Sequence, residues 1–138
     1  MARLRVVLDT NITASAFTKP GGRSAEILQA AADGRFQILV SPSLVRELAK
    51  VLRGKFGRTE NEIQRILRLL AKTGQIVQPQ RPLQIVTADP TDNRMLECAE
   101  AGNADLIGSN DHHLRDLGTF GKIPIIAGPD FRRMLGLK

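Results

Sequence analysis

The chain has 138 residues, of which 42% are hydrophobic and 25% charged, so we expect one globular domain spanning residues 1–138. No apolar run approaches the roughly 20 residues of a membrane span, and no signal peptide is evident, so we expect no membrane association. The 20 basic and 14 acidic residues leave a net charge of +6, which favours nucleic acid or an acidic protein as a partner. With five Phe and no Trp or Tyr, a nucleic acid would be held mainly through its backbone. The single Cys98 cannot form an internal disulfide, which favours a reducing, cytoplasmic setting.

Strand-like and helix-like segments alternate from the start of the chain. Leu4–Leu8 is a short apolar run typical of a buried strand, and Thr18–Gly22 is rich in loop-forming residues. A helix is expected from about Ser24, as its N-cap, to Asp33–Gly34. Phe36–Val40 predicts the second strand.

Two helices are predicted in the middle of the chain. The first begins at Ser41-Pro42, with Ser as the cap and Pro at the first helical position, and runs to about Arg53–Gly54. Thr59 and Glu62 have the spacing of a capping box, which predicts the start of the second. That helix carries four apolar residues on one face: Ile63, Ile66, Leu67 and Leu70.

Shorter elements are predicted in the rest of the chain. Asp89 and Pro90 predict the cap and first residue of a helix that ends near Gly102. Strands are expected at Gln75–Val77, Leu106–Gly108 and Pro124–Ile126. Short helices are expected at His112–Leu117 and Pro129–Leu135. The alternation predicts an α/β fold with a mainly parallel sheet.

Four acidic residues lie where such a fold places its chemistry. Asp9 and Asp111 follow predicted strands, and open α/β sheets bind ligands outside the carboxyl ends of their strands. Asp92 lies in the first turn of its helix and shares a face with Leu96, which must pack on the sheet. Glu47 lies beside the apolar stripe of its own helix. An α/β fold of this kind would bring all four acids to the opening of one cleft.

Each acid also has an ordinary structural explanation when it is taken alone. Asp9 could start a turn, and Asp92 or Asp111 could cap a helix. Glu47 could be a solvated helix residue. Asp89 is the better candidate for capping its helix, which leaves Asp92 available for another role.

Clustered carboxylates have a direct chemical consequence. Several of them within a few ångströms cannot all stay ionised without a counter-charge. Oxygen ligands select Mg²⁺ or Mn²⁺ over zinc, and such ions support in-line attack of water on a phosphodiester. The four acids therefore predict a metal-dependent nuclease. The neighbouring His112 and His113 do not share a helix face, so they are not expected to form a metal site together.

These segments, in this order, resemble a PIN-domain ribonuclease, and in particular the toxins of toxin–antitoxin pairs. The resemblance covers nearly the whole chain and rests on Val7–Asn11, Ser43–Leu48, Asp89–Ala99 and Leu106–Asp111. The Leu-Asp-Thr-Asn segment alone is a weak signal, whereas the ordered set is specific. The resemblance implies a three-layer α/β/α sandwich with a central, mainly parallel sheet.

The resemblance also implies roles for individual residues. The protein would bind Mg²⁺ or Mn²⁺ and cleave RNA to leave 5′-phosphate and 3′-hydroxyl ends. Its catalytic, metal-binding residues would be Asp9, Glu47, Asp92 and Asp111. Supporting residues would be Thr10, Asn11, Asn93, Ser109 and His113. Related sequences often carry a second Asp where this chain has His113, so a second metal would be held weakly, or only with substrate phosphate.

Basic residues crowd the two central helices and the loop between them. The candidates for RNA binding are Arg46, Lys50, Arg53, Arg65 and Arg68. They could form a rim that positions phosphates around the acidic pocket, or only a solvated helix face. The rim hypothesis predicts RNA binding that weakens steeply with salt.

The resemblance further implies an antitoxin protein that covers the site, and a homodimer. Two other functions stay open on the residues alone. A regulatory module with decayed catalysis would bind RNA without cutting it, and His113 would be a symptom of that decay. A receiver-like domain would use Asp9 as a phosphoacceptor, although no second Asp lies two residues later.

Overall fold

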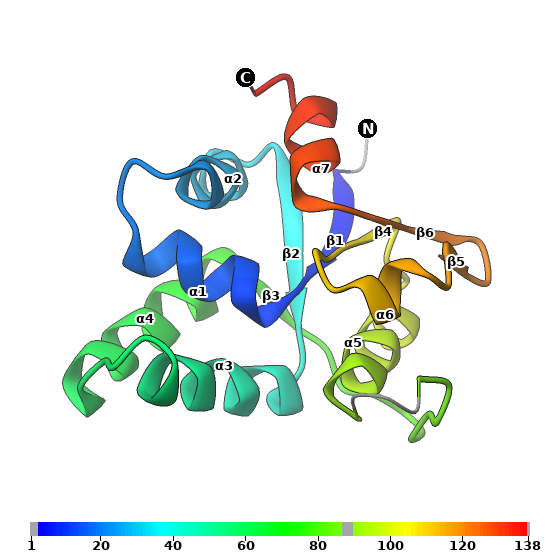
Figure 1. Ribbon diagram of the computed structural model, residues 1–138, viewed down its shortest axis with the longest axis horizontal. Coiled ribbons are helices and arrows are strands. Elements are labelled where there is room, and N and C mark those ends of the chain that lie inside the picture. The colour runs from blue at the N-terminus through cyan, green and yellow to red at the C-terminus, as the bar shows by residue number, and fades with distance from the viewer. Residues whose placement is uncertain (1–2, 87–89, 138) are drawn as a thin grey trace.

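The computed structural model describes residues 3–86 and 90–137, and over these residues it shows a six-stranded sheet flanked by helices (Figure 1). The strand order is β3-β2-β1-β4-β6-β5. The strands are β1 (Leu4–Leu8), β2 (Phe36–Val40), β3 (Gln75–Ile76), β4 (Leu106–Gly108), β5 (Thr119–Phe120) and β6 (Ile123–Ile126). All neighbours pair in parallel except β5, which runs antiparallel to β6. The predicted α/β class with a mainly parallel sheet is confirmed.

Several helices begin at residues whose side chains cap them. They are α1 (Thr10–Thr18), α2 (Arg23–Ala32), α3 (Pro42–Gly54), α4 (Glu60–Thr73), α5 (Pro90–Ala101), α6 (His112–Arg115) and α7 (Gly128–Met134). Ser41 Oγ caps α3 by accepting from Leu44 N at 3.3 Å. Thr59 and Glu62 form the predicted capping box of α4. None of the helices in the described ranges combines the length and apolar composition that crossing a bilayer requires.

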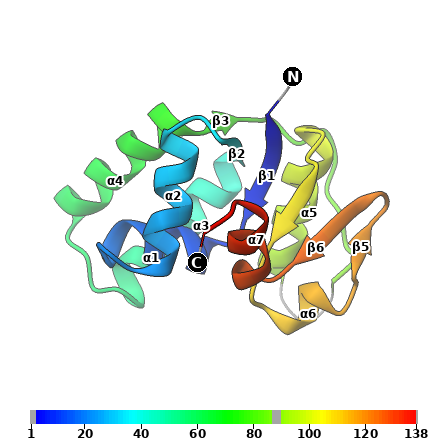
Figure 2. The same cartoon turned by 90° about the horizontal axis from the view of Figure 1, so that it is seen from above.

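Alternation along the strands sends side chains into two separate cores. In β1, Val6 and Leu8 join one core, whereas Val7 joins the other. The first core also takes residues from α1, α2, α3, α4 and α7. The second is built mainly from α5 and the segment 77–86. Figure 2 shows α2 and α4 on one side of β1 and β2, with α5 on the other. This is the expected three-layer α/β/α arrangement.

The segment before α5 is held to that helix by two buried polar side chains. Asn93 Oδ1 accepts from the backbone N–H groups of Ile85 and Val86, and its Nδ2 donates to Val86 O at 2.6 Å. Glu97 accepts from Leu83 N at 2.8 Å and pairs with Arg94 at 2.7 Å. These contacts satisfy backbone groups that pair in no strand, so the irregular segment can cover the second core.

Several local expectations were wrong. The sequence predicted no helix at α1, because its small and Thr-rich stretch has little apolar periodicity. Ser24 does not cap α2, which begins at Arg23 after Gly22 and has no side-chain cap bond. The short strand β5 was not expected either, since two residues carry no readable pattern. The predicted cap Asp89 lies outside the described residues.

Candidate active site

Asp9 and Asp111 reach the same edge of the sheet because their strands are neighbours. β1 pairs with β2 on one side and with β4 on the other, so the chain order reverses between β1 and β4. Such a reversal opens a crevice at the carboxyl ends of the strands. Asp9 N donates to Gly108 O at 2.9 Å, which aligns the two strand ends. A Cβ at Gly108 would lie 2.9 Å from Leu8 Cδ2, so glycine permits this close pairing.

Asp9 is held rigidly where β1 passes into α1. Its side chain is only 7% exposed and caps α1, with Oδ1 accepting from Asn11 N at 2.7 Å. Its other oxygen, Oδ2, accepts from Ser109 Oγ at 2.8 Å. These two bonds orient both carboxylate oxygens. The N-terminal end of α1 adds a favourable dipole for a negative charge.

A single hydroxyl links the two acidic positions. Ser109 is fully buried, and its Oγ accepts from Asp111 N at 3.0 Å while it donates to Asp9. Asp111 caps α6, because its Oδ1 accepts from His113 N at 2.8 Å. Asp111 is half-buried, so its carboxylate remains accessible from the cleft. Ser109 therefore ties the Asp9 carboxylate to the backbone of Asp111.

Asp9 and Asp111 line a cleft of about 320 Å³. Its lining is Asp9, Asn11, Ile12, Ser15, Ser24, Lys55, Asn110 and Asp111. Lys55 Nζ crosses from the end of α3 to donate to Asn11 Oδ1 at 3.1 Å. Asn110 Oδ1 accepts from Gly128 N at 2.9 Å, which ties the cleft to the start of α7. The sequence places Lys55 among the basic residues of a possible phosphate-positioning rim but does not assign it to this cleft, and it gives no role to Ser15, Ser24 or Asn110, because no motif links residues so far apart.

Glu47 and Asp92 lie on neighbouring elements rather than in this lining. Asp92 is 4% exposed in the first turn of α5, and Glu47 is half-buried on α3. Helix α3 packs against both α1 and α5, so the helices that carry the two acids are neighbours. Among residues 3–86 and 90–137, no three His, Cys, Asp or Glu side chains gather closely enough to hold a metal together.

The remaining supporting residues are placed by the fold as follows. Thr10 is buried as the first residue of α1. The Asn93 amide is engaged by backbone groups of residues 85 and 86. The His113 ring is exposed and lies 3.9 Å, centroid to centroid, from the His112 ring.

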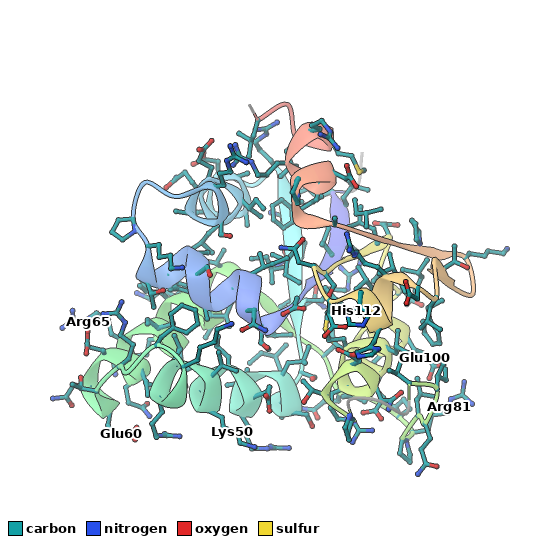
Figure 3. All side chains as sticks on the ribbon, in the orientation of Figure 1. Lys50, Glu60, Arg65, Arg81, Glu100 and His112 are labelled. Carbon is teal, nitrogen blue, oxygen red and sulfur yellow. The ribbon has the colours of Figure 1, made fainter. Side chains whose placement is uncertain are left out.

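The predicted RNA-binding residues occupy different surfaces. Figure 3 shows Lys50 on the outer side of α3 and Arg65 on α4, away from His112. Arg68 is exposed on α4. Arg46 lines a separate hollow of about 380 Å³ beside α5.

Arg53 is engaged in an ion pair on the surface of α3. Its guanidinium donates to both carboxylate oxygens of Glu60, at 2.6 and 3.0 Å. This contact raises the pKa of Arg53 and lowers the pKa of Glu60, in each case chiefly through the hydrogen bonds. A phosphate would have to compete with Glu60 for this guanidinium.

Comparison with known proteins places the chain in a family. A family model described as the PIN domain matches residues 5–113, which include Asp9 and Asp111. The chain belongs to the PIN-domain family, whose members are generally nucleases. The uncharacterised protein MJ1680 of Methanocaldococcus jannaschii is 31% identical over 127 residues, covering 88% of this chain and 81% of that protein.

Two solved structures share the fold. The crystal structure of VapBC2 from Rickettsia felis, bound to a DNA fragment from their promoter, matches with a TM-score of 0.62 at 16% identity, covering 90% of this chain and 98% of that one. PAE2754 from Pyrobaculum aerophilum matches with a TM-score of 0.61 at 16% identity, covering 99% and 91%. At this identity the likeness shows the fold alone, and the expected PIN-like architecture is confirmed.

Proposed function

We propose that the protein is a metal-dependent endoribonuclease and the toxin of a toxin–antitoxin pair. The observation that carries the proposal is the bridge through Ser109, which holds Asp9 and Asp111 together at the carboxyl edge of the sheet. The PIN-domain match supports nuclease chemistry at this edge. The net charge of +6 supports a polyanionic substrate.

The donors of the cleft suit Mg²⁺ or Mn²⁺. Asp9, Asp111, Asn11 and Asn110 present oxygen atoms there, and the cleft lining holds no His or Cys among the described residues. Two carboxylates are enough for Mg²⁺, which keeps several waters and takes further ligands from substrate phosphate. The bound ion would supply Lewis acidity to the phosphodiester and to the attacking water.

The protein's own groups would orient the reaction. Ser109 and the backbone of Asn11 fix the Asp9 carboxylate, so its oxygens need no rearrangement when a ligand arrives. We propose that Glu47 and Asp92 complete the acidic set once a substrate strand lies across α3 and α5. Arg46, Lys50, Arg65 and Arg68 would hold phosphates on either side.

The test is cleavage of a labelled structured RNA with Mg²⁺, Mn²⁺ or EDTA. We expect metal-dependent cutting that Asp9→Asn or Asp111→Asn reduces by more than about 100-fold, since a ligand should matter at least as much as the groups that orient it. Asp33→Asn is the matched control, because Asp33 is an exposed residue at the end of α2 and outside the cleft lining. Equal activity in Asp9→Asn, Asp111→Asn and Asp33→Asn would refute the proposed site.

The partners we propose are RNA, an antitoxin protein and a second copy of the chain. The structural neighbour VapBC2, bound to a fragment of its promoter, supports an antitoxin partner. Cellular RNA as the target would place the protein in the cytoplasm. Co-expression with a small neighbouring reading frame should relieve growth arrest, and light scattering should give twice the chain mass of 15.1 kDa.

A second candidate is an RNA-binding module that has lost catalysis. Within the described residues, only two of the four predicted acids, Asp9 and Asp111, line the cleft, which favours this candidate. His113 at a position where related sequences carry an acid favours it too. This module would bind RNA equally well in EDTA and would cut with no metal. In that case His113→Asp is the variant to test for restored cleavage.

A further inference from the structure

Lys55, from the basic stretch at the end of α3, brings a cation into the acidic cleft. It lies at the C-cap of α3, and its Nζ donates to Asn11 Oδ1 at 3.1 Å. The backbone N–H of the same Asn11 donates to the Asp9 carboxylate. Asn11 therefore contacts Asp9 through its backbone and Lys55 through its side chain. The lining of the cleft therefore includes the two acids Asp9 and Asp111 and one lysine.

The charge of Lys55 is not consumed by a carboxylate. Within the described residues, the ion pairs of the structure include neither Lys55 nor Lys19. The contact of Lys55 with Asn11 uses a neutral acceptor and one of its three N–H donors. Two donors and a full positive charge therefore remain for a ligand.

A second lysine lies beside the same aromatic ring. Lys19 Nζ and Lys55 Nζ each lie 5.8 Å from the centroid of the half-buried Phe56 ring. The ring packs against the first core, so it gives both side chains a fixed neighbour. Cation–π attraction holds each ammonium near the ring without neutralising it. Two like charges brought together in this way favour an anion between or beside them.

We propose that Lys55 and Lys19 form a phosphate-binding subsite at the mouth of the cleft. Lys55 holds the backbone phosphate that lies over Asp9 and Asp111, and Lys19 holds the neighbouring phosphate of the same RNA strand. The two lysines would offset the repulsion between a phosphodiester and the carboxylates of Asp9 and Asp111. This inference rests on the proposed function, since it takes RNA as the ligand.

The test measures RNA binding without metal or cleavage. Fluorescence anisotropy of a labelled single-stranded RNA in EDTA, at several KCl concentrations, compares wild type with Lys55→Met, Lys55→Arg and Lys19→Met. Methionine keeps an unbranched stem against Phe56 and removes the charge. Lys122→Met is the matched control, because Lys122 is exposed in the turn between β5 and β6. Far-UV circular dichroism checks that every variant is folded.

We expect Lys55→Met to weaken binding about tenfold, as for loss of a charged hydrogen bond, and to reduce the salt slope by about 0.7. Lys55→Arg should retain most of the affinity, Lys19→Met should reduce the slope by a similar amount, and Lys122→Met should match wild type. Lys55→Met with wild-type affinity and slope would overturn the subsite.

The two proposals can fail separately. Binding that depends on Lys55, without cleavage under any metal, supports the subsite and removes the nuclease. Cleavage that depends on Asp9 but is unaffected by Lys55→Met supports the nuclease and removes the subsite.

Discussion

Ser109→Ala tests whether one hydroxyl organises the candidate site. Ser109 is 0% exposed, and its Oγ both donates to Asp9 Oδ2 and accepts from Asp111 N. Alanine removes both bonds and should leave the backbone that follows β4 unchanged. Asp9 and Asp111 should keep their positions in the chain but lose the hydroxyl that bonds to both of them.

The expected cost follows from those two bonds. A hydrogen bond to a charged group contributes about 1.5–3 kcal/mol, and one between neutral groups contributes about 1 kcal/mol. Water in the cleft can replace part of this loss, because Asp111 is half-buried. We therefore expect the free energy of unfolding to fall by about 2 kcal/mol. RNA cleavage should fall about 10- to 100-fold, the usual effect of losing a group that orients a metal ligand.

Urea unfolding followed by far-UV circular dichroism measures the stability, since the chain has no Trp or Tyr. Ser41→Ala is the matched control, because Ser41 is also 0% exposed but caps α3 and touches neither acid. Ser41→Ala should cost about 1 kcal/mol and leave cleavage intact.

Two results would refute the reasoning about Ser109. The first is a Ser109→Ala protein whose stability and cleavage both equal wild type. The second is equal loss of cleavage in Ser109→Ala and Ser41→Ala, which would show that any buried serine has the same effect.

Three further predictions concern the scaffold. Gly108→Ala should cost about 1–3 kcal/mol in urea unfolding, because its Cβ would lie 2.9 Å from Leu8 Cδ2; an unchanged midpoint would contradict the close packing of β1 and β4. The pKa of Glu62 is lowered chiefly by the backbone N–H of Thr59, so its contribution to stability is present above about pH 4.5 and is lost as the pH falls through the lowered pKa. The stability difference between wild type and Glu62→Gln should therefore close in acid, and a difference independent of pH would contradict the capping box. Burial raises the pKa of the Cys98 thiol from 9.0 to about 12. The stability of the fold with a neutral Cys98 is therefore fully present below pH 9, and part of it is lost as the pH rises toward 12. Cys98→Ala should show a shallower alkaline loss of stability, and rapid labelling of native Cys98 by a thiol reagent would contradict its burial.

Local patterns were sufficient for most of the scaffold. The mainly apolar runs of β1, β2 and β4 identify buried strands by themselves, because strands covered on both faces of a parallel sheet are nearly continuous hydrophobic runs. The caps at Ser41 and Thr59 are equally readable, since a capping side chain bonds a backbone group only two or three residues away. These features depend on neighbours in the sequence.

Part of the candidate site could also be predicted from the sequence. Asp9 and Asp111 follow strands, and the carboxyl ends of adjacent parallel strands share one edge. The resemblance names Ser109 as a supporting residue, but its bond to Asp9 could not be derived from local patterns, because it joins Asp9 to a residue 100 positions later. For Asn93, the resemblance predicts a supporting role at the site. The structure shows that its amide bonds the backbone of residues 85 and 86, which the sequence did not predict.

Residue types, strand runs and helix caps are determined by the sequence itself, because they express local chemistry and local backbone geometry. The partners of Lys55 were decided only by the tertiary structure. Its ammonium reaches Asn11 across 44 residues because α1 packs on α3, and that packing depends on apolar side chains from several elements of the first core. The sequence places this lysine in a basic stretch that fits either a solvated face or a phosphate-positioning rim, whereas the folded protein places it in one cleft with two carboxylates.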